Sequence, residues 1–308
     1  MSKIEEIENL QKLIKDDSSN FEARKNLAVL LIDSGFNEEA LKHLLYLSKT
    51  FSFDENILYN IGIVYEKLKK LENAREYYEK AVDIKPDFLD AIYNLGLVYS
   101  ELKDYEKAIF CFEKILAEDN TDSNSFFNLG LAYFKTNDFQ KALEQFEKAI
   151  QLNDDDLYAH FYKGNIHKDF NQLDLAKQEF SKVLELSQDY SWAYYNLAVI
   201  DFEQGDLASA KNNLQKTVEL NPLDTDAYKI LAKIHVKNND YDSATNTINE
   251  ALENCTELGD LYYLKAKICK HFGDSDNEII SMENAIENSQ TLTFSISKIK
   301  KELAKIKK

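Results

Sequence analysis

The chain has 308 residues, of which 44% are hydrophobic and 30% are charged, and its formal net charge is −17 at pH 7. The hydrophobic share excludes a disordered tail, and the negative charge argues against nucleic-acid binding, which needs a basic surface. The first residues lack an apolar signal-peptide core and no stretch approaches 18 apolar residues, so we expect neither a signal peptide nor a membrane span. The three cysteines show no metal-type spacing and suit a reducing compartment, so we expect a cytoplasmic protein.

Residues 1–20 are expected to form an N-terminal capping helix. Leu10 and Leu13 fall at apolar helix positions when the 34-residue frame described next is extended backwards. A stacked array needs such an end helix because its terminal repeat otherwise leaves an apolar face open to water.

A period of 34 residues follows this helix. Seven alanines mark it without an insertion: Ala40, Ala74, Ala108, Ala142, Ala176, Ala210 and Ala244. Four glycines have the same spacing, each twelve residues before an alanine: Gly62, Gly96, Gly130 and Gly164. Pro86 and Pro222 lie four periods apart, where one helical pair is expected to end and the next to begin. Such a period indicates a repeat array.

Each period has the pattern of two amphipathic helices. In residues 89–122, Ile92, Leu95 and Tyr99 belong to a first helix and Phe112 to a second. Three glycines fall at the turn between the two helices, where a positive φ is often required: Gly35, Gly205 and Gly273. Period-two alternation is absent, so no strands are expected.

The segment IYNLGLVYSELKDYEKAIFCFEKILAEDN (92–120) resembles the tetratricopeptide repeat, with small residues at repeat positions 8 and 20 and aromatic residues at 11, 17 and 24. The resemblance covers residues 21–292 as eight repeats: 21–54, 55–88, 89–122, 123–156, 157–190, 191–224, 225–258 and 259–292. It implies an all-α, right-handed superhelical solenoid of helix-turn-helix repeats with capping helices. It also implies that first helices line a concave groove and second helices face the convex side.

The alanines are expected where two helices, typically about 8–10 Å apart, approach most closely. A larger side chain there would overpack the contact. Glu278 occupies the eighth alanine position and Ser275 an aromatic one, so the last repeat is interpreted as degenerate.

Residues 293–308 are expected to form a lysine-rich C-terminal capping helix. They contain six lysines, one glutamate and an apolar stripe: Phe294, Ile296, Ile299, Leu303 and Ile306. A basic amphipathic helix can also dock on an anionic membrane. The stripe is needed to cover the last repeat, which favours the cap, and no membrane partner is expected.

Three rows of first-helix residues are predicted to face the concave groove and bind a peptide. An amide recurs at repeat position 6: Asn60, Asn94, Asn128 and Asn196. An aromatic ring recurs at position 5: Tyr59, Tyr93, Phe127, Phe161 and Tyr195. Position 9 is apolar in Leu97 and Leu131. Amides at this spacing could pair with the N–H and C=O groups of an extended peptide, which resembles the asparagine ladder of O-linked N-acetylglucosamine transferases. Because these residues are common in the repeat, a role in folding alone is the alternative.

Lysines gather in the last third of the predicted groove. The candidate peptide-binding residues are Lys229, Lys233 and Lys267, with Lys237, Lys270 and His271 nearby. They could bind an acidic group or a C-terminal carboxylate of a partner, and the alternative is a solvated face. The two-carboxylate clamp of co-chaperone repeats is not expected, because Leu264 replaces its asparagine.

A polar row occupies repeat position 11 in three successive repeats, with His167, Asp201 and His235. A metal or proton-relay site could be built from these residue types, but a spacing of about 8–10 Å between helices favours a structural row. Phosphate-binding loops, nucleophile elbows and HExxH helices are absent from the sequence. We therefore expect no catalytic residues, no metal and no cofactor.

The sequence thus predicts a non-catalytic scaffold that binds a peptide or helix of a partner protein in its concave groove. The scaffold is expected to be a monomer or to self-associate weakly. The main alternative is an architectural module acting through its ends or convex face, and a minor one is an enzyme or metal-binding protein.

Overall fold

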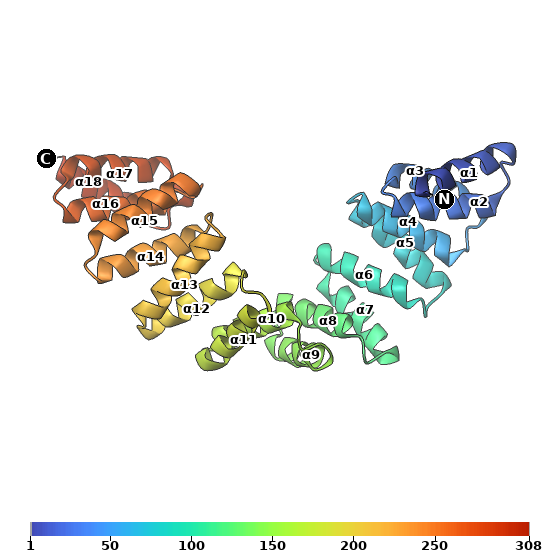
Figure 1. Ribbon diagram of the computed structural model, residues 1–308, viewed down its shortest axis with the longest axis horizontal. Coiled ribbons are helices and arrows are strands. Elements are labelled where there is room, and N and C mark those ends of the chain that lie inside the picture. Colours follow the sequence, from blue (N-terminus) through green and yellow to red (C-terminus); the bar gives the residue numbers. More distant parts are fainter. Residues whose placement is uncertain (1, 308) are drawn as a thin grey trace. The chain divides into compact units, whose positions relative to one another are not determined.

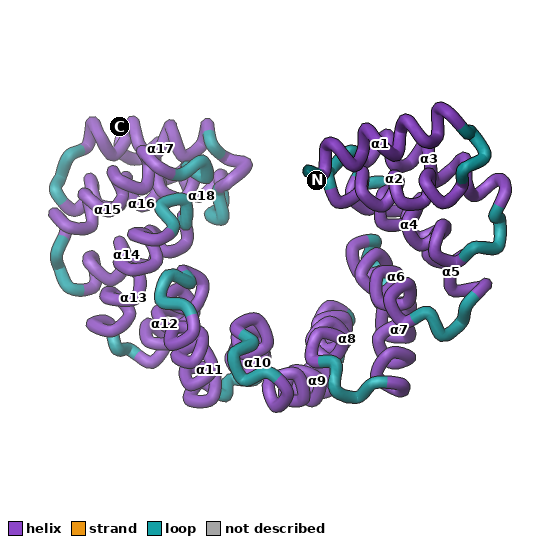
Figure 2. Tube along the Cα trace, turned by 45° about the vertical axis from the view of Figure 1, so that its right-hand side comes forward, coloured by secondary structure: helices purple, strands orange, loops and turns teal. Residues whose placement is uncertain are grey.

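The computed structural model describes residues 2–307, which form eighteen α-helices, one short 3₁₀ helix and no β-strand (Figures 1 and 2). An N-terminal helix, α1 (Lys3–Asp16), precedes eight helix pairs. The first helices of the pairs are α2 (Phe21–Asp33), α4 (Glu55–Lys67), α6 (Leu89–Glu101), α8 (Ser123–Lys135), α10 (Leu157–Asp169), α12 (Ser191–Gln204), α14 (Thr225–Lys237) and α16 (Gly259–His271). The second helices are α3 (Asn37–Thr50), α5 (Leu71–Ile84), α7 (Tyr105–Glu118), α9 (Phe139–Leu152), α11 (Leu173–Leu186), α13 (Leu207–Leu220), α15 (Tyr241–Asn254) and α17 (Ser275–Glu287). The chain ends with η1 (Ser289–Thr291) and α18 (Ile296–Ile306). The prediction of an all-α fold of helix pairs is confirmed.

The chain divides into two compact units, residues 1–159 and residues 160–308. Within a unit, second helices pack between the first helix of their own pair and that of the next, as α5 does between α4 and α6 and α13 does between α12 and α14. First helices of neighbouring pairs also touch, since α6 contacts α8 in the first unit and α14 contacts α16 in the second. The surface formed by the first helices of a unit is called its first-helix face below.

The seven alanines that mark the period are fully buried. Each lies on a second helix, in the first turn. Burial of such a small side chain is what close helix packing requires, because a larger one would push the two helices apart.

The side chains at repeat positions 8 and 24 are matched in size. Glycine at position 8 faces an aromatic ring at position 24 in four repeats: Gly62–Tyr78, Gly96–Phe112, Gly130–Phe146 and Gly164–Phe180. A Cβ atom placed on Gly130 would lie 2.8 Å from a ring carbon of Phe146, so the ring fills the space of the missing side chain. In the other four repeats, alanine shares a core cluster with an aliphatic residue: Ala28–Leu44, Ala198–Leu214, Ala232–Ile248 and Ala266–Met282. The total volume at this contact is therefore nearly conserved.

One turn residue in every helix pair has a positive φ. The eight positions follow the period, and only three are glycine: Gly35, Lys69, Lys103, Asn137, Asn171, Gly205, Asn239 and Gly273. Asparagine tolerates the left-handed region through its short polar side chain, whereas lysine meets a steric cost there. The turn is thus imposed by the packing of the two helices it joins.

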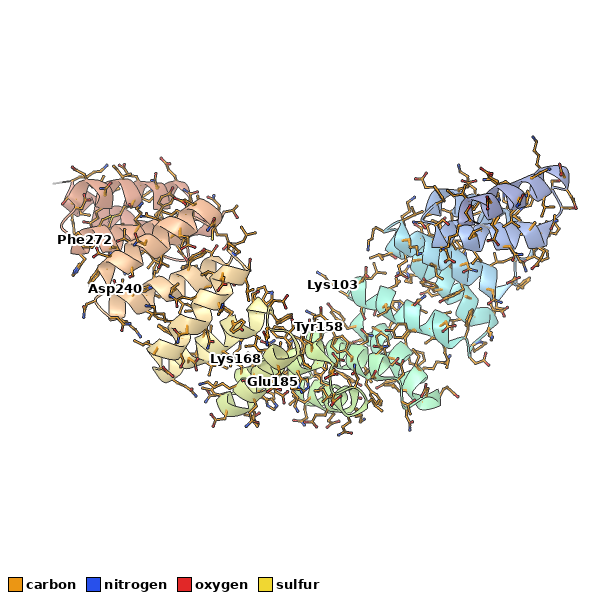
Figure 3. The ribbon with its side chains drawn as sticks, in the orientation of Figure 1. Lys103, Tyr158, Lys168, Glu185, Asp240 and Phe272 are labelled. Carbon is orange, nitrogen blue, oxygen red and sulfur yellow. The ribbon has the colours of Figure 1, made fainter. Side chains whose placement is uncertain are left out.

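Replacing Lys103 with glycine should raise the free energy of unfolding by about 0.5–1 kcal/mol. Lys103 lies in the turn between α6 and α7 with φ at 64° (Figure 3). Relief of a left-handed strain of about 1–2 kcal/mol outweighs the entropy that glycine adds to the unfolded chain. Urea unfolding of Lys103→Gly and of Asn137→Gly tests this, and the asparagine variant should gain less. A lower unfolding midpoint for Lys103→Gly would contradict the strain argument.

Helix α1 covers the first pair through one apolar face. Ile7 is buried, and Leu10 and Ile14 pack against the core cluster that includes Leu27. Leu13 is 49% exposed, since the face that meets α2 follows the helical spacing of Ile7, Leu10 and Ile14.

Helix α18 covers the last pair. Ile299 is fully buried, and Leu303 and Ile306 pack against the cluster that contains Tyr263 and Met282. Ion pairs lie at its edges, between Lys267 and Glu302 at 2.6 Å and between Lys307 and Glu283. No helix between residues 2 and 307 is both long and apolar enough to cross a bilayer.

Glu278 occupies the alanine position of the last pair and is only 4% exposed. Its Oε1 atom is buried and has no hydrogen-bond partner among the described residues. A buried oxygen without a partner opposes folding, so this substitution weakens the contact that alanine makes in the other repeats.

Candidate binding surfaces on the first helices

In the first unit, aromatic rings at repeat position 5 are held by aromatic rings of the second helices. Tyr59 lies 5.7 Å from Tyr78, Tyr93 lies 6.0 Å from Phe112, and Phe127 lies 5.9 Å from Phe146, measured between ring centroids. Each position 5 ring is half-buried. Each ring is therefore partly packed against the second helices and partly exposed.

The asparagines at position 6 donate to tyrosines of the preceding repeat. Asn94 Nδ2 lies 3.1 Å from Tyr59 Oη, and Asn128 Nδ2 lies 3.1 Å from Tyr93 Oη. Their side-chain oxygens accept no hydrogen bond from residues 2–307. Asn60 has no such bond, because the preceding repeat has Lys25 where a tyrosine would lie.

The tyrosine hydroxyls in this row stay protonated at neutral pH. Burial raises the pKa of Tyr93, and the nearby carboxylate of Asp122 raises it further, although the hydrogen bond from Asn128 opposes them. Burial likewise raises the pKa of Tyr59, with Asp90 adding to the effect. The row is thus a set of neutral hydroxyl and amide groups at a spacing of one repeat.

A cavity of about 330 Å³ opens beside these residues, named the Tyr93 pocket here. It is lined by residues of three successive pairs: Tyr59, Leu89, Asp90, Tyr93, Asn94, Ile115, Asp119, Asp122 and Asn124. Its three aspartates were not among the residues predicted from the sequence. Asp119 and Asp122 lie in the loop between repeats, outside the first helices to which the prediction was confined. Leu97 and Leu131, at position 9, are half-buried on α6 and α8.

In the second unit, the aromatic row continues but the amide is enclosed. Phe161 packs on Phe180, and burial together with Asp226 and Asp224 raises the pKa of Tyr195 to about 12. Asn196 is only 4% exposed, accepts a hydrogen bond from Lys168 and donates to the carbonyl of Trp192. The amide of Asn196 thus differs from those of Asn94 and Asn128, because the preceding repeat lacks a tyrosine hydroxyl and the amide is hydrogen-bonded within the chain.

A cavity of about 500 Å³ lies between α12, α14, α15 and α16, named the lysine-rimmed pocket here. Its lining combines apolar and basic side chains: Phe202, Ala232, Lys233, Val236, Lys237, Tyr241, Leu264, Lys267, Ile268, Lys270 and His271. Four lysines and one histidine line this pocket, and all five belong to the basic cluster predicted from the sequence. Phe202 was not predicted to line this pocket, because its repeat position alone does not show that the helices of the next pair leave its side chain partly exposed.

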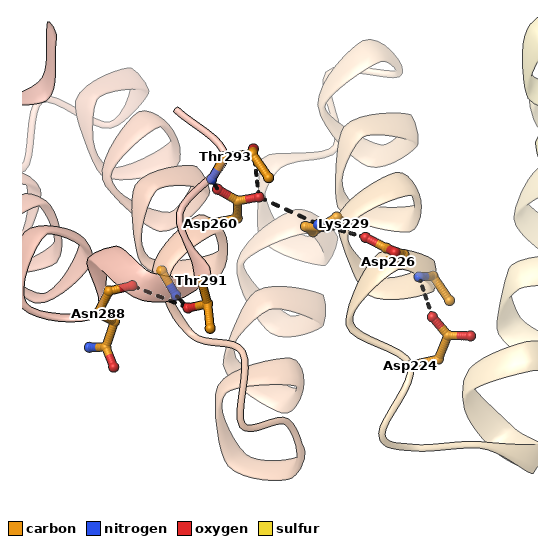
Figure 4. Close-up of polar contacts among 9 residues, drawn as sticks. Asp224, Asp226, Lys229, Asp260, Asn288, Thr291 and Thr293 are labelled. Carbon is orange, nitrogen blue, oxygen red and sulfur yellow. Dashed lines mark hydrogen bonds and ion pairs between the residues drawn. The ribbon is translucent and has the colours of Figure 1, made fainter. Parts of the chain in front are cut away.

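Lys229 has a different environment from the other lysines. Its Nζ atom lies 2.6 Å from Asp226 and 3.4 Å from Asp260, and Asp260 also accepts hydrogen bonds from the backbone and side chain of Thr293 (Figure 4). Burial lowers the pKa of Lys229, but the two aspartates outweigh it and raise the pKa overall. Lys229 thus helps to anchor the segment before α18 and does not line the lysine-rimmed pocket.

The polar row at position 11 has separate partners in each repeat. His167 is hydrogen-bonded to Gln172, Asp201 forms an ion pair with Lys177 at 2.6 Å, and His235 pairs with Asp240. Over residues 2–307, no three His, Cys, Asp or Glu side chains are placed to hold a metal ion. These contacts explain the three buried polar side chains as parts of the helix packing.

Comparisons with known proteins agree with the helix pairs. Two family models described as tetratricopeptide repeat match residues 53–118 and 201–268, and a model described as anaphase-promoting complex, cyclosome, subunit 3 matches residues 101–183. A search of curated proteins gave no match.

Several solved structures are similar to the chain. A tetratricopeptide repeat protein from Parabacteroides merdae is 17% identical, covers 82% of this chain and 99% of its own, and has a TM-score of 0.58. MamA from Desulfovibrio magneticus RS-1 is 26% identical over 56% of this chain and 97% of its own, with a TM-score of 0.54. YrrB, described as a tetratricopeptide repeat protein with an unusual peptide-binding site, is 25% identical over 61% of this chain and 96% of its own, with a TM-score of 0.52.

The fold is thus that of the helical repeat scaffolds, whose stacked pairs provide extended surfaces for other proteins. The chain is a tetratricopeptide repeat protein, as the sequence predicted.

Proposed function

We propose that the chain is a non-catalytic cytoplasmic scaffold that binds a peptide segment or helix of a partner protein on its first-helix faces. The observation that carries the proposal is the orientation of Asn94 and Asn128. Their amide nitrogens are held by tyrosine hydroxyls, and their amide oxygens have no partner in the described chain. Such oxygens suit the backbone N–H groups of an extended peptide, which need acceptors when they leave water.

The surroundings of the two asparagines support the same function. The Tyr93 pocket offers a recess for a partner side chain, and the half-buried Leu97 and Leu131 offer apolar contact. Concave sites with apolar walls and a few fixed polar groups are typical of ligand recognition. The similarity to YrrB supports peptide binding as a use of this fold.

Replacing both Asn94 and Asn128 with alanine should reduce partner binding about thirtyfold, because two hydrogen bonds of about 1 kcal/mol each are lost. The measurement is affinity capture from a native lysate, followed by the affinity of the captured partner for each variant. The matched control is Gln140→Ala with Gln151→Ala, two exposed amides on the second helix α9 of the same unit. Equal capture by the asparagine variant and the wild type, with unchanged helical circular dichroism, would refute the proposed face.

A further inference from the structure

The lysine-rimmed pocket has apolar walls and a basic edge. Its walls include Phe202, Val236, Leu264 and Ile268, and its volume of about 500 Å³ is ample for a large side chain. Pockets of a few hundred Å³ with mostly apolar walls bind ligands by enclosing an apolar group. The walls therefore favour a partner residue with a bulky aliphatic or aromatic side chain.

Three of the four lysines at the basic edge are not neutralised by the chain itself. Lys233, Lys237 and Lys270 form no ion pair with any residue from 2 to 307, and no carboxylate lines the pocket. Lys237 Nζ lies 4.4 Å from the centroid of the Phe202 ring, and His271 stacks on Tyr241. In a chain of net charge −17, this concentration of positive charge is local, and it is complementary to an acidic ligand.

One lysine at the edge already binds a carboxylate of this chain. Lys267 Nζ lies 2.6 Å from Glu302 Oε2, and the hydroxyl of Tyr263 donates to the same oxygen at 3.3 Å. Burial lowers the pKa of Lys267, but the bond to Glu302 and the contact with Tyr263 raise it overall, so the ammonium group is retained. This contact shows that the edge can place an ammonium group on a carboxylate in a part-buried setting.

We propose that the lysine-rimmed pocket binds an internal acidic segment of a partner protein, in which a large apolar side chain is flanked by aspartates or glutamates. The inference rests on the proposed scaffold function and names a second contact site within it. The apolar side chain enters the pocket between α12, α14 and α16. The flanking carboxylates lie on Lys233, Lys237 and Lys270.

The test uses the full chain and a C-amidated peptide of sequence Asp-Glu-Phe-Asp-Glu with fluorescein on its N-terminal amine, and fluorescence anisotropy is the readout. The peptide should bind with a micromolar Kd in 50 mM NaCl and several times more weakly in 300 mM NaCl, since salt screens the charges. Lys233→Glu with Lys270→Glu should weaken binding at least tenfold. The control, Lys182→Glu with Lys216→Glu, changes the net charge equally on the second helices α11 and α13, away from the pocket, and should change the Kd less than twofold.

Three further probes test the kind of ligand. Exchange of the peptide's phenylalanine for alanine should weaken binding at least tenfold. A peptide whose only carboxylate is its free C-terminus should bind more weakly than the amidated acidic one. A peptide with lysine and arginine flanks should show no binding.

The proposal is overturned if the acidic peptide fails to bind at 1 mM, or if the control pair weakens binding as much as the pocket pair. Tighter binding of the peptide with only a C-terminal carboxylate, or of a single-stranded oligonucleotide, would overturn it as well. The variant with Asn94→Ala and Asn128→Ala should bind the acidic peptide normally. If the asparagine variant loses partner capture but the chain does not bind the acidic peptide, only this inference is refuted. If the chain binds the acidic peptide but the asparagine variant keeps partner capture, only the proposed asparagine face is refuted.

Discussion

Replacing Phe146 with alanine should lower the free energy of unfolding by about 3–5 kcal/mol, the typical cost of removing a buried aromatic side chain. Phe146 is fully buried on α9, and its ring fills the space beside Gly130. The substitution removes apolar burial and leaves a cavity that the glycine cannot fill, because it has no side chain to shift. Urea unfolding monitored by circular dichroism measures the change.

The matched control is Phe110→Ala on the neighbouring second helix α7, where the ring is 66% exposed. This variant should lose less than about 1 kcal/mol, because little apolar area is buried. Similar losses in the two variants would show that the ring of Phe146 does not determine the packing of its repeat.

Replacing Glu278 with alanine should raise the free energy of unfolding by about 1–3 kcal/mol, in contrast to most substitutions of buried residues. The glutamate places a buried oxygen without a hydrogen-bond partner at a contact that fully buried alanines make elsewhere. Removing a group of this kind recovers its desolvation cost. Alanine also favours the helix in which it would lie.

Thermal unfolding measures the effect of Glu278→Ala, with Glu283→Ala on the same helix as the control. Glu283 lies at the surface and pairs with Lys307, so its replacement should leave the unfolding midpoint unchanged or lower it slightly. A fall in the unfolding midpoint of Glu278→Ala would mean that the glutamate's aliphatic part contributes more to packing than its buried oxygen costs.

The period made the fold predictable from the sequence. Small side chains at fixed spacing are needed wherever two helices approach closely, so Ala40 and its equivalents report packing directly. The positive φ at Lys103 was not predictable from residue type, because lysine has no preference for that region. It becomes predictable only when the turn is recognised as the equivalent of Gly35.

The candidate sites were predictable in part. The sequence placed Tyr93, Asn94 and Lys233 on first helices, and each lines one of the two pockets described above. Sequence periodicity could not show that the amide of Asn94 is held by Tyr59, nor that Glu302 reaches Lys267. Such contacts depend on side-chain conformations across different helices, which a repeat frame does not specify.

The matched pairs at repeat positions 8 and 24 set a compatibility rule for exchanging parts of the chain. A whole repeat carries both partners, so it can replace another repeat without changing the volume at this contact. A single helix carries only one partner. A first helix with glycine combined with a second helix that has leucine would leave a void, and alanine combined with phenylalanine would clash. The unit that can be exchanged without disturbing this contact is therefore the pair of helices.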